Sequence, residues 1–128
     1  MQKFSQVAER EGQATKVDIF ISTCLVSVTV MHSAHFVTGS YAQHKAFEEF
    51  YTAMPALVDR FAETHIGITG SYKPVIKFDA SIDTVEYLRR MVAQGDEIYP
   101  ALDSSLKSIM DEIKSLCFQT IYKLTKLS

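Results

Sequence analysis

An uninterrupted apolar segment near the N-terminus limits the folds open to this chain more than any other feature. Residues 17–36 read VDIFISTCLVSVTVMHSAHF and contain neither glycine nor proline. The β-branched side chains favour strands, but a strand rarely extends this far, so we predict a helix over 17–36. Because that helix is apolar around most of its circumference, it has to be buried on several sides, as in a helical bundle or at a subunit contact. A strand is the main alternative.

Helical periodicity continues after a short turn at residues 38–40. Ser40 is a suitable N-cap for a second helix over 41–65, and Pro55 is expected to bend that helix. Residues 67–80 contain two glycines and a proline. This composition predicts a long, partly extended connection after the second helix.

Two further helices follow the connection. A short helix is predicted over 82–93, capped by Ser81 and ended by Gly95. The last helix begins after Asp103 or Ser104 and carries apolar residues at helical spacing toward the C-terminus. The sequence thus predicts an all-α fold in which four helices form a single domain at residues 16–128. Residues 1–15 form a polar N-terminal tail in this prediction.

Charge, cysteine usage and hydropathy exclude several classes of function. The net charge of −2 and the absence of a lysine or arginine run argue against nucleic acid binding. Cys24 and Cys117 stand alone in apolar patterns, which indicates reduced core residues in a reducing compartment. The N-terminus lacks the apolar part of a signal peptide, and residues 17–31 are short for a membrane span. We therefore expect a cytoplasmic protein with no membrane partner.

The second predicted helix carries a stripe of histidine and carboxylate side chains beside its apolar face. At about 100° per residue, His44, Glu48, Asp59 and Glu63 fall within one sector roughly 100° wide. Imidazole and carboxylate groups together suit iron, zinc or manganese. The alternative is a solvated helix edge with ordinary i, i+4 contacts and no metal at all.

One copy of this helix cannot bring the whole stripe to a single ion. His44 and Glu48 precede Asp59 and Glu63 by fifteen residues, which is roughly 22 Å along a helix. The sequence therefore predicts either two separate sites or one site completed by a two-fold related copy, and a homo-oligomer formed through the first two helices. His35 or His32, near the end of the first helix, is the candidate for a further ligand.

Residues 35–44, HFVTGSYAQH, carry a resemblance to known proteins. The segment resembles the ferritin-like superfamily and, within it, the starvation-induced DNA-binding proteins (Dps). Their second helix has a histidine, an aspartate fifteen residues later and a glutamate four beyond, the spacing of His44, Asp59 and Glu63. A closer similarity, over residues 17–127, is to an uncharacterised, largely phage-encoded Dps-like family with an HWxTxSYAxH pattern.

The resemblance implies a ferritin-like four-helix bundle with an iron-oxidising site shared between subunits. In that site His35, His44 and Glu48 come from one subunit, and Asp59 and Glu63 come from a two-fold partner. The lysine-rich tail with which Dps proteins bind DNA is missing, so DNA compaction is not implied. The rival hypothesis is a non-enzymatic oligomer, a phage structural or host-interaction protein without metal. The expected location is the host cytoplasm, or the virion if the protein is structural.

Overall fold

The computed structural model describes residues 13–127, and within them the chain is entirely helical, with no strand. The elements are α2 (Lys16–Val37), α3 (Tyr41–Thr69), α4 (Thr84–Ile98), the 3₁₀ turn η1 (Tyr99–Ala101) and α5 (Ser104–Lys126). The predicted all-α class with four long helices is confirmed, and the strand alternative for residues 17–36 is wrong. Most of the predicted tail lies outside the described residues.

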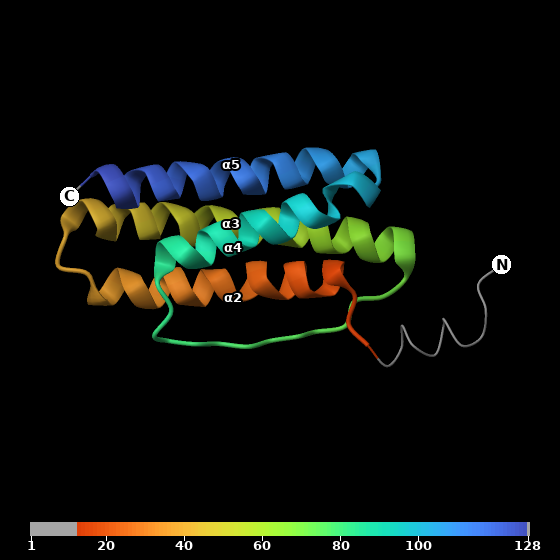
Figure 1. Cartoon of the computed structure of the whole chain (residues 1–128), viewed down its shortest axis with the longest axis horizontal. Helices are drawn as coiled ribbons and strands as arrows, with labels where there is room; N and C mark the ends of the chain where they lie inside the picture. Colours follow the sequence, from red (N-terminus) through yellow and green to blue (C-terminus); the bar gives the residue numbers. More distant parts are fainter. Residues whose placement is uncertain (1–12, 128) are drawn as a thin grey trace.

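The four long helices lie side by side and enclose one hydrophobic core. Each packs against two others, in the order α2, α3, α5, α4 around the bundle. Neighbouring helices run antiparallel (Figure 1). Because α3 ends at the opposite end of the bundle from the start of α4, residues 70–83 have to run along its length to join them (Figure 1). We call this extended connection the strap.

Helix α2 begins with a reciprocal cap that compensates for its β-branched composition. The Asp18 backbone N–H donates to the Thr15 hydroxyl, and the Thr15 backbone N–H donates to the Asp18 carboxylate. By length and composition alone α2 could cross a membrane, but half of its most apolar stretch is buried inside the protein. Its apolar surface is therefore used in the core, where Phe20, Ile21 and Met31 are almost fully buried.

Helix α3 is longer than predicted, because its glycines act differently from what the sequence suggests. It continues without interruption through Pro55, passes the predicted end at residue 65 and includes Gly67. It stops at Gly70, whose φ of 86° is the left-handed conformation that glycine adopts without strain. Ser40 caps the first turn, as predicted, by accepting a hydrogen bond from the Gln43 backbone N–H.

Both ends of helix α4 differ from the prediction. It begins at Thr84 with Asp83 as its N-cap, and it continues through Gly95 to Ile98. Gly95 is buried inside the helix, where a Cβ atom would lie 2.8 Å from the Met110 sulfur. It is therefore needed for close packing and does not end the helix. The N-cap of α5 is Asp103, one of the two predicted residues.

The strap is fastened to α2 by polar side chains that are buried in the fold. The Lys73 backbone N–H donates to Asp18 Oδ1 at 3.2 Å, and the Val75 backbone N–H donates to Ser22 Oγ at 2.9 Å. The Tyr72 hydroxyl lies 2.8 Å from the same serine oxygen. Asp18 and Ser22 are 5% and 1% exposed. A long segment without secondary structure is thus held by hydrogen bonds that replace those of a helix.

We expect the substitution Asp18→Asn to lower the free energy of unfolding by about 1–2 kcal/mol. The Thr15 and Lys73 backbone N–H groups donate to different oxygens of Asp18, and asparagine has an NH₂ donor in place of one of these oxygens. Urea unfolding and amide hydrogen exchange in the strap measure the effect. Asp83→Asn is the matched control, since asparagine caps helices as well as aspartate does. Unchanged stability and unchanged exchange at Lys73 in Asp18→Asn would contradict the assignment.

Candidate functional site

The end of α2 and the start of α3 bring the predicted histidines together as a cluster of stacked rings. The rings of His35 and His44 lie with their centroids 3.7 Å apart and their planes at 28°. His32 stacks on Tyr51 at 4.1 Å, and the Tyr51 ring also meets His35 edge-on at 5.3 Å. We call these four residues, His32, His35, His44 and Tyr51, the histidine cluster.

Hydrogen bonding fixes the tautomer of one histidine and leaves an atom of the other without a partner. His44 Nδ1 lies 3.1 Å from the backbone carbonyl oxygen of His35. Because a carbonyl only accepts, this nitrogen carries the proton, and in neutral His44 the lone pair is on Nε2. His35 Nδ1 is buried and has no hydrogen-bond partner among residues 13–127. Within residues 13–127, His35 Nδ1 and His44 Nε2 are therefore imidazole nitrogens that have no hydrogen-bond partner in the protein.

Desolvation, with the neighbouring His44, favours the neutral form of His35. Partial desolvation, followed by the neighbouring His44, lowers the pKa of His35, and the Glu48 carboxylate opposes this shift. Glu48 itself accepts a hydrogen bond from the Lys45 ammonium at 2.7 Å, and this bond lowers the pKa of Glu48. A neutral imidazole beside an ionised carboxylate is the protonation state that metal binding requires.

The other two predicted ligands lie away from the cluster on the same helix. Asp59 and Glu63 are exposed on α3, and neither takes part in an ion pair within residues 13–127. Within that range one chain contains no group of three histidine, cysteine, aspartate or glutamate side chains placed to hold an ion. One copy of the chain thus brings together His35 and His44, with Glu48 nearby, and leaves the acidic pair apart.

The chemical types of the donor groups suit a transition metal, but the orientations of the histidine rings do not. Two imidazoles and a carboxylate form a set that iron, zinc and manganese accept. A metal-ligating histidine commonly donates its other N–H to a backbone carbonyl, as His44 does. However, imidazole lone pairs lie in the ring planes, so the stacked rings of His35 and His44 do not point at one position. One ring has to turn before both nitrogens can bind the same ion.

Sequence reasoning missed Tyr51, whose ring holds the cluster together. Its position seven residues after His44 places it on the same stripe of α3, and this spacing could have revealed it. His32 was a candidate ligand, but the structure places it exposed at the outer end of the stack, in contact with Tyr51 and Phe36. The geometry thus favours His35 over His32 as the partner of His44.

Comparison with known proteins places the chain among phage-type sequences. A family model described as "Family of unknown function (DUF5856)" matches residues 35–124, a region that contains all five predicted ligands. The chain is also 34% identical, over 127 residues, to a protein of Enterobacteria phage T4 described as "Uncharacterized 14.6 kDa protein in mobD-ri intergenic region". That similarity covers 96% of this chain and 98% of the phage protein. No solved structure matches the chain.

Proposed function

The chain belongs to the DUF5856 family of unknown function. From the geometry of α2 and α3 we propose that it is a ferritin-like homo-oligomer. We propose that this oligomer binds a transition metal between its subunits and that it prefers iron. In this proposal His35, His44 and Glu48 of one subunit face Asp59 and Glu63 of a two-fold partner. The buried, unpartnered Nδ1 of His35, next to the ring of His44, is the observation that supports it.

The proposed ferritin-like classification rests on topology. Antiparallel neighbours with one connection that runs the length of the bundle are the arrangement of ferritin-like bundles (Figure 1). The four helices share one core, which supports a single domain from residue 16 onward. As a phage-type protein it would act in the cytoplasm of the host cell.

The outer surface of α2 and α3 has the composition of a subunit contact. No aspartate, glutamate, lysine or arginine occurs at residues 19–44 or 50–58. On this surface Leu25, Thr52 and Ala56 are exposed, and Pro55 is half-buried. Loss of charge at the centre of a patch is the feature that distinguishes contacts from the remaining surface. The exposed apolar groups would be covered by a second copy.

The proposed ligands lie at the two ends of this surface, which a two-fold axis would bring together. His44 and Lys45 lie near the start of α3, and Asp59 and Glu63 lie in its second half. When two copies of α3 pack antiparallel, the histidine end of each faces the acidic pair of the other. Interhelical ion pairs link α2 to α4, α3 to α5 and α4 to α5, but none crosses between α2 and α3 among residues 13–127. Asp59 and Glu63 thus remain available to a partner.

The chemistry follows from the donor set. Fe(II) as substrate would lose one electron to an oxidant such as dioxygen, and the carboxylates would stabilise the Fe(III) product because hard oxygen ligands favour the higher charge. His44 keeps its Nδ1 proton on the His35 carbonyl, so its Nε2 is the nitrogen available to the ion. Glu48 would exchange its bond to Lys45 for the ion.

We expect purified protein, reloaded with Fe(II) without oxygen, to retain near-stoichiometric metal, and His44→Ala and Asp59→Ala each to lose it. Metal content by mass spectrometry is the measurement, with the oligomeric state recorded on the same samples. Glu86→Ala is the control, because this exposed carboxylate lies on α4, away from the surface of α2 and α3. Absence of metal from an intact wild-type oligomer would rule out the metal site.

Mixing the two variants tests whether the site is shared between subunits. A dimer of one His44→Ala and one Asp59→Ala subunit keeps one site with every ligand, so a statistical mixture should recover about one quarter of the wild-type metal. If each chain forms its own site, mixing should recover none. This result separates a shared site from a site within one subunit.

A specific observation favours the rival function, a phage structural or host-interaction protein without metal. The rings of His35 and His44 stack instead of pointing their nitrogens at one position, and Glu48 is already paired with Lys45. In that case the same two-fold contact would form, but neither His44→Ala nor Asp59→Ala would change the metal content. The metal measurement therefore decides between the two.

A further inference from the structure

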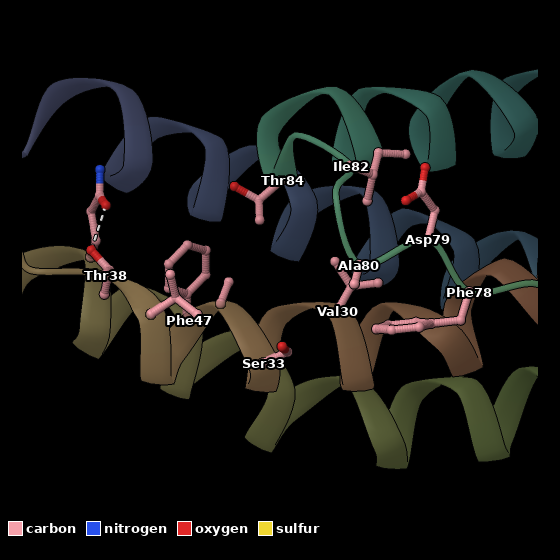
Figure 2. Close-up of a pocket in the computed structure, with 12 residues that line it drawn as sticks. Val30, Ser33, Thr38, Phe47, Phe78, Asp79, Ala80, Ile82 and Thr84 are labelled. Carbon is pink, nitrogen blue, oxygen red and sulfur yellow. Dashed lines mark hydrogen bonds between the residues drawn. The ribbon is translucent and has the colours of Figure 1, made fainter.

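A cavity of about 280 Å³ lies between the C-terminal half of α2, the end of the strap and the start of α4. Figure 2 shows Val30 and Ser33 of α2 on one side and Ile82 of the strap and Thr84 of α4 on the other. The rings of Phe47 and Phe78 lie toward its two ends (Figure 2). The volume is near the lower limit for small-molecule sites, which are mostly apolar with a few polar groups.

Two hydroxyl groups in the wall have no hydrogen-bond partner among the residues that the structure describes. Several helical hydroxyls here, those of Ser27, Thr120 and Thr125 among them, donate to a backbone carbonyl one turn earlier. Ser33 on α2 and Thr84 on α4 make no such bond within residues 13–127, and both line the cavity. By contrast, Thr38 and Asp79 are satisfied by Gln43 and Ser81. The free hydroxyls define where a ligand could be hydrogen-bonded.

The cavity is independent of the histidine cluster. Val30, Ser33 and Val37 follow each other at helical spacing on one side of α2, and His35 lies on nearly the opposite side. None of the residues that line the cavity is a proposed metal ligand. A ligand here would instead bridge α2 to the strap and α4.

We propose that this cavity binds a small neutral molecule that has one aromatic ring and one hydroxyl or amine group. The volume accommodates a single ring, and the flanking phenylalanine rings favour a flat aromatic partner. Ser33 and Thr84 supply hydrogen bonds to its polar group. Asp79, the one charged residue in the wall, is directed toward Ser81 and not into the cavity (Figure 2), so a charged ligand is not favoured.

Phenol is the probe, and toluene is the matched comparison because it has the ring without the hydroxyl. Titration of the full chain, followed by backbone amide NMR, should give saturable shifts at residues 30–38 and 78–84. We expect a dissociation constant of about 1 mM or tighter, appropriate to a ligand of this size. Protection of the strap amides from hydrogen exchange should rise on binding.

Two variants make the result decisive. Ala80→Leu, which fills the cavity, should abolish the shifts. Ser33→Ala combined with Thr84→Val should reduce the phenol-to-toluene affinity ratio by about fivefold, while Ser115→Ala on α5 should change nothing. Absence of saturable shifts in the folded wild-type protein, or equal binding by Ala80→Leu, would overturn the proposal. Metal loading of all variants should stay at the wild-type level, because the two sites share no residue.

Discussion

Placing an arginine at Thr52 is expected to dissociate the proposed oligomer. Thr52 is exposed on α3 and lies midway between His44 and the Asp59–Glu63 pair. If a two-fold axis places His44 of one copy opposite the Asp59–Glu63 pair of the other, Thr52 of one copy lies close to Thr52 of the other. Two like charges in a desolvated contact cost several kcal/mol, which corresponds to a rise in the dissociation constant of roughly 100-fold or more.

Sedimentation velocity over a range of concentrations measures this effect. Arginine is a good helix former on an exposed surface, so the Thr52→Arg monomer should keep its helical content and its unfolding transition. Ser115→Arg, at an exposed position on α5, is the control and should leave the oligomer intact. If Thr52→Arg assembles like the wild type, the contact does not lie on this face, and a metal site that depends on that contact has no second half.

Gly95→Leu is expected to destabilise the fold by about 3 kcal/mol, at the upper end of the range for overpacking a core. A Cβ at this position would lie 2.8 Å from Met110 Sδ and 3.5 Å from the ring of Phe20. Met110 is fully buried, and Phe20 is 1% exposed. Because both side chains are buried, the added leucine atoms have to displace them or shift α4.

Gly67→Ala is the matched control, because Gly67 is also inside a helix but a Cβ added there would meet no atom within 4 Å. Alanine there should stabilise α3 by up to about 1 kcal/mol, since it restricts the unfolded chain and has a higher helix propensity. Urea unfolding measures both changes, with m unchanged if the native and unfolded states keep their compactness. Destabilisation of both variants by a similar amount would show that packing at Gly95 is not the cause.

These two glycines also show why parts of the fold could not be predicted. Gly67 and Gly95 looked like helix ends, but both lie inside helices, while Gly70 ends α3. A glycine ends a helix only where the chain has to adopt a positive φ in order to turn toward the next element. The path of the strap sets that position, and the strap is held by Asp18 and Ser22 more than 50 residues away in sequence.

In the candidate site, too, some features could be predicted from the sequence and others depend on tertiary packing. The spacing of His44, Glu48, Asp59 and Glu63 is a property of one helix, so their shared stripe and the distance between the two pairs followed from sequence. The stacking of His35 on His44 and the contact between His32 and Tyr51 depend on how α2 packs against α3. No periodicity within either helix contains that information.

By itself, the sequence determined the elements of local origin: the helical state of α3 and α5, the cap at Ser40, and the apolar faces that form the core. These depend on side chains within about two helical turns of one another. Only the tertiary structure decided where α3 and α4 end, which buried polar groups hold the strap, and which histidine meets His44. Those features arise from contacts between distant segments, whose energies exist only after the helices have packed.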